Sequence, residues 1–358
     1  MSTDGNNTDP LKVSKKYEKL TKRNTIIHEF NQSSSEISLS LASKDLLSEA
    51  SKLLHQGVKQ QQAGDLNAAI KSLEESLVLF QALGNSRKQE KVLSLLALTA
   101  YTSGSYQKTI SYCEQCLSLM TDTSDLAVRM QIFSHLGNAY RHLNNYEKAI
   151  QFLEESLKIT QQQQDRRSQV AALNNLGLVY KAVGKVAQAI EYQEQSLKIV
   201  RELQDNWGEE QVLKNLGNTW YALDDYPKAI AYYEKCLDLS RTLKNLRSAV
   251  YVLKNLGNSC YALGDYAKAI IYYEERLQLA RVIQDKRSEE QSLGSLGVAC
   301  EALGDYSKAI TYHEQRLFLA RAINDVRTQE QALASLKLAC YALGDYAKAM
   351  QYQTTEFD

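Results

Sequence analysis

The sequence is poor in several features that would point to particular classes of protein. It has only two prolines in 358 residues, and no stretch of roughly eighteen apolar residues that could cross a membrane. Lysine plus arginine equals aspartate plus glutamate at 42 each, so there is no basic excess of the kind found in duplex-binding domains. The N-terminus lacks the apolar segment of a signal peptide. We therefore expect a helical, cytoplasmic protein without membrane insertion, and the charge balance argues against nucleic acid as a partner.

The six cysteines do not form an obvious metal-binding or disulfide framework. Cys113 and Cys116 form a C-x-x-C, but no second pair with metal-ligand spacing accompanies it. Cys260, Cys300 and Cys340 are spaced by forty residues and occupy one position of a repeat. Small buried thiols explain this usage better than redox or metal chemistry. We expect no metal and no cofactor.

What the sequence does have is a repeat of forty residues. VLKNLGNTWYALDDY, which begins at residue 212, returns as VLKNLGNSCYALGDY from residue 252. Helix-capping residues recur at the same phase and predict eight units, at Asp45, Asn85, Asp125, Asp165, Asp205, Asn245, Asp285 and Asp325. Residues that tolerate a left-handed backbone recur midway, at Gly64, Gly104, Asn144, Gly184, Asp224, Gly264, Gly304 and Gly344. Each unit is therefore predicted to be two antiparallel helices, A and B, of roughly 17 residues each.

Residues 1–44 differ from the repeat region at 45–358. They begin with a polar segment that we expect to be partly disordered, followed by a short basic amphipathic stretch at 11–23. That stretch suits a solvated tail, or alternatively a helix that docks on the first repeat. The serines between 33 and 40 resemble a linker.

The A helices have one apolar face that contains a recurring glycine. In the fifth repeat, Leu213, Leu216, Gly217 and Trp220 lie in one sector of the helix. A glycine within a helix costs about 1 kcal/mol relative to alanine, so its recurrence indicates that packing needs the space. A single helix pair cannot bury both of its apolar faces. Successive pairs must stack, which predicts an all-α, right-handed α-solenoid.

These residues resemble the tetratricopeptide repeat. The family pattern of an apolar residue, Leu-Gly and an aromatic residue on helix A, then Tyr and Ala on helix B, is matched by Leu213, Leu216, Gly217, Trp220, Tyr226 and Ala229. The forty-residue length is similar to the repeats of kinesin light chains, of Pins-class G-protein signalling modulators and of cyanobacterial arrays. The second and eighth repeats depart from the pattern, with Ala97 and Lys337 in the glycine position. The resemblance implies a scaffold for protein partners and leaves their identity open.

The opposite face of the A helices carries polar residues at equivalent positions. We predict that this face forms a peptide-binding groove, because carboxamides can donate to and accept from the backbone of a peptide. Its residues are Asn138, Arg141, Asn174, Asn175, Lys214, Asn215, Asn218, Tyr221, Lys254, Asn255, Asn258 and Tyr261. Lys214 and Lys254 could pair with acidic side chains or a terminal carboxylate.

The resemblance implies the same role, since Pins-class and kinesin-light-chain repeats hold extended peptides with asparagines at such positions. The match fails in the late repeats, where Ser295 and Val298 replace asparagine. The alternative is that these asparagines are simply solvated. Arg276 and Arg316 occupy a helix B position that holds Ser or Cys in earlier repeats, and they either reach the groove or form inter-helix ion pairs.

No catalytic constellation is present in the sequence. His135 and His142 lie on the groove face of one helix without a repeated carboxylate partner, which argues against acid–base or metal chemistry. We therefore expect a non-enzymatic adaptor that binds an extended peptide or a helix. The alternative is a module that self-associates through its C-terminal repeat.

Overall fold

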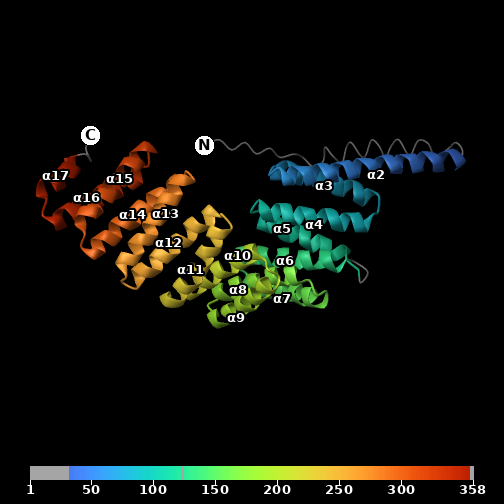
Figure 1. Cartoon of the computed structure of the whole chain (residues 1–358). Helices are drawn as coiled ribbons and strands as arrows, with labels where there is room; N and C mark the ends of the chain where they lie inside the picture. Colours follow the sequence, from blue (N-terminus) through green and yellow to red (C-terminus); the bar gives the residue numbers. More distant parts are fainter. Residues whose placement is uncertain (1–31, 122–124, 355–358) are drawn as a thin grey trace. The chain divides into compact units, whose positions relative to one another are not determined.

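The computed structural model describes residues 32–121 and 125–354, with side chains from residue 43 to residue 352. Within these ranges the protein is helical and has no strand, as the sequence predicts (Figure 1). Helices that form repeat pairs follow one another as α2 (Gln32–Gln62), α3 (Leu66–Ala82), α4 (Ser86–Thr102), α5 (Tyr106–Leu119), α6 (Leu126–His142), α7 (Tyr146–Gln162), α8 (Arg166–Ala182), α9 (Val186–Glu202), α10 (Asn206–Tyr221), α11 (Tyr226–Thr242), α12 (Leu246–Ala262), α13 (Tyr266–Val282), α14 (Lys286–Leu303), α15 (Tyr306–Ala322), α16 (Val326–Leu343) and α17 (Tyr346–Thr354).

The predicted capping residues start the A helices in all repeats but the first. The side chains of Asn85, Asp125, Asp165, Asp205, Asn245, Asp285 and Asp325 each accept a hydrogen bond from a backbone N–H in the first turn. Asp45 does not cap a helix, because α2 already begins at Gln32. Asp45 lies inside the helix, where backbone N–H groups bond to the preceding turn, so no cap is needed there. The serine-rich segment predicted to be a linker therefore lies within α2, and residues 11–23 fall outside the described part.

The turns inside the repeats adopt the left-handed backbone that their residues suggest. Asn144 and Asp224 have φ of 59° and 57°, and the glycines at the other predicted positions have φ between 76° and 84°. Six turns between repeats also contain a left-handed residue, and four of these residues are lysine or glutamine, which are less suited to that backbone. Lys244 and Gln284, for example, have φ of 53° and 56°. Except between α5 and α6, where Met120 is extended and residues 122–124 are not described, the chain reverses direction by the same backbone device.

The helices form two compact units, α2 to α6 and α7 to α17. In the second unit each helix contacts the next, and the A helices also contact one another, α8 with α10, α10 with α12 and α12 with α14. A continuous core results, in which the side chains of one repeat pack on those of the next. One cluster runs from Leu197 through Leu216 and Tyr233 to Leu256. This stacking of helix pairs is the arrangement of an α-solenoid.

At the recurring glycines the nearest atoms belong to side chains of helix B. A Cβ at Gly217 would lie 2.5 Å from a ring carbon of Tyr233, and one at Gly257 would lie 2.3 Å from the equivalent atom of Tyr273. At Gly297 the side chain in contact is that of His313, which is fully buried. The predicted need for space is confirmed, and an aromatic ring fills it at these three glycines, whereas Gln193 fills it at Gly177.

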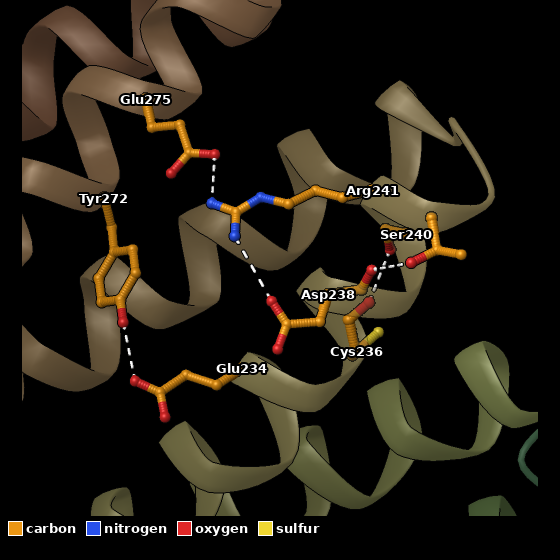
Figure 2. A network of polar contacts seen from close by, with 8 residues as sticks. Glu234, Cys236, Asp238, Ser240, Arg241, Tyr272 and Glu275 are labelled. Carbon is orange, nitrogen blue, oxygen red and sulfur yellow. Dashed lines mark hydrogen bonds and ion pairs between the residues drawn. The ribbon is translucent and has the colours of Figure 1, made fainter.

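A second series of contacts joins successive B helices through tyrosine and glutamate. Figure 2 shows Tyr272 on α13 donating to Glu234 on α11, with an O–O distance of 2.9 Å. Beside it, Arg241 bonds Glu275 at 2.7 Å. The tyrosine–glutamate contact recurs with a separation of 38 residues, in the pairs Tyr112–Glu74, Tyr232–Glu194, Tyr272–Glu234, Tyr312–Glu274 and Tyr352–Glu314. We call these contacts the tyrosine–glutamate series.

The described residues include no helix that is both long and apolar enough to span a membrane. All six cysteines are buried and unbridged, as expected for thiols that fill core positions. Burial raises the pKa of Cys116 to about 12, so its thiol remains protonated and unreactive at neutral pH. The C-x-x-C motif is therefore part of the core.

Candidate peptide-binding surface

Most residues of the predicted groove lie together on one face of α8, α10 and α12. We call this face the ladder surface, and its residues are Asn174, Asn175, Lys214, Asn215, Asn218, Tyr221, Lys254, Asn255, Asn258 and Tyr261. All of them are partly buried. They lie between the core residues of the same helices, so each A helix presents apolar side chains inward and these polar ones outward. Because α8, α10 and α12 pack against one another, the three helices form one continuous surface.

The carboxamides of the ladder surface bond to one another across helices. The Nδ2 group of Asn215 on α10 donates to Oδ1 of Asn174 on α8 at 2.8 Å. The Nδ2 group of Asn255 on α12 donates to Oδ1 of Asn218 on α10 at 3.2 Å. Each bond joins neighbouring A helices, so these four asparagines are held in fixed orientations.

Tyrosines beneath and beside the surface fix two of these asparagines further. The Tyr233 hydroxyl donates to Oδ1 of Asn218 at 2.6 Å, and the Tyr273 hydroxyl donates to Oδ1 of Asn258 at 2.8 Å. Nδ2 of Asn218 also reaches the hydroxyl of Tyr251 at 3.2 Å. Tyr233 and Tyr273 are the same rings that pack on Gly217 and Gly257, which means that one side chain serves both the core and the ladder surface.

The cations of this region have aromatic and buried surroundings. Nζ of Lys214 lies 5.7 Å from the ring centre of Tyr251, which is the range of a cation–π contact. Burial lowers the pKa of Lys181, which lies on α8. Tyr221 and Tyr261 each pack against a tyrosine across the turn that follows, with ring centres 5.4 and 5.1 Å apart.

Asn138 and Arg141 belong to the other compact unit and behave differently. Asn138 was expected on an open face, but it is only 8% exposed, and its Nδ2 donates to the backbone oxygen of Ser134 at 3.0 Å. Oδ1 of Asn138 lacks a partner among the described atoms. This asparagine is therefore not an accessible groove residue.

Arg141 and His142 form part of an aromatic cluster at the end of α6. Nη2 of Arg141 lies 3.0 Å from Nε2 of His142, and the His142 ring stacks on Tyr106 with centres 4.3 Å apart. Burial lowers the pKa of His135, which lies two turns earlier on the helix, to about 4. Both histidines are thus placed by packing, and no group of three metal-ligating side chains occurs in the described part of the protein.

The two unusual arginines line a pocket at the end of the ladder surface. It has a volume of about 480 Å³ and is lined by residues of α12, α13, α14 and α15, including Lys254, Asn258, Arg276 and Arg316. Arg316 forms an ion pair with Glu290 at 2.7 Å, which confirms one of the two interpretations of this position. Arg276 bonds the side chain of Gln291 at 2.9 Å. Both arginines also reach the pocket.

Comparison with known proteins assigns the family. The model of the tetratricopeptide repeat matches residues 88–162, 168–242 and 246–322, which is more than half of the chain. The chain belongs to the tetratricopeptide repeat family. No curated protein sequence matches it. Tetratricopeptide repeats typically act as interaction modules, and the ladder surface is the face on which this protein presents its repeated polar residues.

Solved structures share this tetratricopeptide fold at low sequence identity. A signal-transduction ATPase with a tetratricopeptide repeat sensor, from Pyrococcus horikoshii, matches with a TM-score of 0.66 and 17% identity, over 86% of this chain and 47% of that one. The apo quorum sensor NprR from B. thuringiensis matches with a TM-score of 0.58 and 15% identity, over 96% and 92% of the two proteins. Aspartyl phosphate phosphatase F from Bacillus subtilis matches with a TM-score of 0.57 and 15% identity, over 85% and 78%. These likenesses show the fold alone.

Several residues of the surface were not predicted from the sequence. Tyr233, Tyr273, Tyr251, Glu290 and Gln291 were given no part in this surface. The signal for the first two was present, since tyrosine stands fifteen positions after an asparagine in both the fifth and sixth tetratricopeptide repeats. For contacts between residues of different repeats, such as Tyr251 with Asn218, the sequence has no comparable signal.

Proposed function

We propose that this protein is a non-enzymatic, cytoplasmic adaptor that binds an extended peptide along the ladder surface. The observation that carries the proposal is the row of asparagines held by hydrogen bonds from α8 to α12. Asn215 bonds Asn174, and Asn255 bonds Asn218. A bound peptide then loses less free energy to the ordering of side chains, because these carboxamides are already oriented.

The carboxamides have hydrogen-bonding capacity left for a ligand. Oδ1 of Asn258 accepts from Tyr273. The Nδ2 group of Asn258 has no hydrogen-bond partner within residues 43–121 and 125–352. A carboxamide donor and acceptor can bond the backbone carbonyl and amide groups of an extended peptide without reading its side chains. The sequence of the partner would then be selected by neighbouring residues such as Lys214 and Lys254.

A peptide display library, panned against the immobilised full-length protein, tests the proposal. We expect selected peptides to bind the wild type, and the variant with Asn175→Ala, Asn215→Ala and Asn255→Ala to bind them at least tenfold more weakly. The matched control is Asn206→Ala, which removes an exposed asparagine from the first turn of α10. The proposal fails if selected peptides bind the triple variant as tightly as they bind the wild type.

Self-association is a second candidate function, favoured by exposed apolar side chains on α16 and α17. Leu338 is 69% exposed and Met350 is 55% exposed. Such a patch is a common feature of protein interfaces. Light scattering over a range of concentrations tests it, with Leu338→Ser and Met350→Ser expected to shift a dimer to monomer. A wild type that stays monomeric at high concentration rules this function out.

A further inference from the structure

The pocket at the end of the ladder surface has a cationic lining. Of its charged residues, Lys254, Arg276 and Arg316 are positive and only Glu290 is negative. The ladder position that holds lysine at 214 and 254 is glycine at 294, and this substitution keeps the pocket open beside Arg316. A Cβ at Gly294 would lie 3.2 Å from Cζ of that arginine. The pocket is therefore suited to an anionic group.

The two arginines replace small residues that are satisfied within their own repeat. At the same position of helix B, Ser196 donates to the backbone oxygen of Val170 at 3.3 Å. Cys236 likewise donates to the backbone oxygen of Glu210 at 3.4 Å. An arginine in this position has several donors to satisfy instead of one. The change at Arg276 and Arg316 is thus a change in chemistry and not only in size.

Arg316 shows how the fold satisfies such an arginine. Its Nη2 donates to Gln331 at 3.1 Å and its Nε donates to the carboxylate of Glu290 at 2.7 Å. Charge-assisted bonds of this kind are the strong ones in proteins. One carboxamide and one carboxylate together hold this guanidinium.

Arg276 has the first of these partners and lacks the second. Its Nη2 donates to Gln291, which is the equivalent of Gln331 one repeat earlier. The residue forty positions before Glu290 is Val250, which has no carboxylate. Nε of Arg276 is buried and has no hydrogen-bond partner among the described atoms, although the residue is only 3% exposed. Arg276 is therefore a buried cation that lacks the carboxylate partner which Arg316 has.

Other acids near Arg276 are engaged elsewhere. Asp285 caps α14 by accepting from the backbone N–H of Ser288 at 3.1 Å. Glu290 is paired with Arg316. Both act on Arg276 through space, and burial lowers the pKa of its guanidinium, which nevertheless stays protonated at neutral pH. An unpaired buried cation is energetically unfavourable, so binding a carboxylate from another molecule would stabilise the guanidinium of Arg276.

We propose that Arg276 binds a carboxylate of the bound peptide, with Lys254 as a second cation at the mouth of the pocket. The proposal rests on the proposed function, since it supplies the chemical class of peptide that the ladder surface selects. The ion pair between Glu290 and Arg316 is an example, within this protein, of the contact that we expect between the peptide carboxylate and Arg276. The carboxylate belongs either to an acidic side chain or to the C-terminus of the peptide, and the experiment below separates these sources.

Three fluorescein-labelled peptides measure the preference by fluorescence anisotropy. The first alternates glycine and glutamate and has blocked ends, the second replaces glutamate by glutamine, and the third is the glutamine peptide with a free C-terminal carboxylate. We expect the first or the third to bind the full-length protein at least tenfold more tightly than the second. Physiological salt in the buffer screens long-range attraction. Equal binding of all three peptides overturns the proposal.

Two variants test whether the preference belongs to Arg276. Arg276→Ser installs the residue of earlier repeats, and Val250→Glu installs the carboxylate that the seventh repeat already has. We expect each to abolish the preference, the first by removing the cation and the second by occupying it. Arg247→Ser, which removes an exposed arginine from α12, should leave it unchanged. A preference that survives both pocket variants refutes the assignment.

A small probe separates this proposal from the proposed function. N-acetyl-glutamate amide at millimolar concentration should shift the Nε–H resonance of Arg276 in a nuclear magnetic resonance spectrum, and N-acetyl-glutamine amide should not. If no peptide binds but the glutamate probe shifts this resonance, the peptide function fails while the carboxylate site stands. If neither probe shifts it, the site fails whether or not peptides bind.

Discussion

The hydrogen bond between Tyr233 and Asn218 allows the coupling between core and ladder surface to be measured. Tyr233 is 1% exposed, and its hydroxyl lies 2.6 Å from Oδ1 of Asn218. Asn218→Ala leaves this buried hydroxyl without its acceptor, which costs about 1–3 kcal/mol. Tyr233→Phe should cost only about 1 kcal/mol, because Asn218 keeps its bonds to Tyr251 and Asn255.

The double variant should lose less free energy of unfolding than the two single variants lose together. With both groups removed, no hydroxyl is left unsatisfied, so we expect a coupling free energy of about 1–2 kcal/mol. Long repeat arrays open locally, and a single global unfolding free energy is then poorly defined. Hydrogen exchange is the better measurement, followed by mass spectrometry on peptides from α10 and α11.

In that assay about 1.4 kcal/mol corresponds to a tenfold change in exchange rate. We expect Asn218→Ala to accelerate exchange in α10 and α11 by about tenfold or more, and to leave α16 unchanged as an internal reference. Asn206→Ala is the matched control. Strict additivity of the two single variants would falsify the claim that this hydroxyl depends on this asparagine. The result also decides how binding data are interpreted, since a ladder variant that loses peptide could do so by loosening α10.

Three other perturbations follow from the packing and the charges. Gly257→Ala places a Cβ 2.3 Å from the ring of Tyr273, so hydrogen exchange in α12 and α13 should accelerate by the equivalent of about 1–2 kcal/mol, because the overpacking outweighs the gain in helix propensity. Tyr272→Phe removes the bond to Glu234 and should weaken the contact of α11 with α13 by about 1 kcal/mol, measured as faster hydrogen exchange in both helices, whereas an unchanged rate would show the bond to be energetically neutral. Burial lowers the pKa of His135 to about 4, so the unfolded chain takes up a proton below about pH 6.5 that the folded chain does not, and folding should weaken by about 2 kcal/mol between pH 7 and pH 5. Hydrogen exchange in α6 of the wild type and of His135→Gln at both pH values, corrected for intrinsic exchange rates, checks this, and equal losses in the two proteins contradict it.

The sequence is sufficient to predict the fold because its local signals agree with one another. Capping residues such as Asn245 and turn residues such as Gly264 recur at a fixed phase, and each acts within one turn of helix. Asp45 shows where this reasoning fails. The residue has the right type and phase, but helix α2 extends through it, so its side chain caps no helix start. Phase alone therefore does not place the first helix boundary.

The candidate site is harder to predict because its contacts join different repeats. The phase of Asn218 places it on the outer face of the helix, and this is correct. Its partners Tyr251 and Asn255 lie 33 and 37 residues away, and no local pattern selects them. Asn138 has the same phase but is buried, since the fit of one side chain depends on neighbours that vary from repeat to repeat. Arg276 and Arg316 likewise share a position and differ in their partners.

The tyrosine–glutamate series has a consequence for how the length of this protein can change. Each bond joins residues 38 positions apart, in a protein whose repeat is forty residues long. Removal of residues 245–284 would bring Tyr312 to the distance from Glu234 that Tyr272 has now. Duplication of a whole repeat would preserve the spacing in the same way, whereas the loss of a few residues would break it. Gene duplication can thus lengthen the array without inventing a new interface.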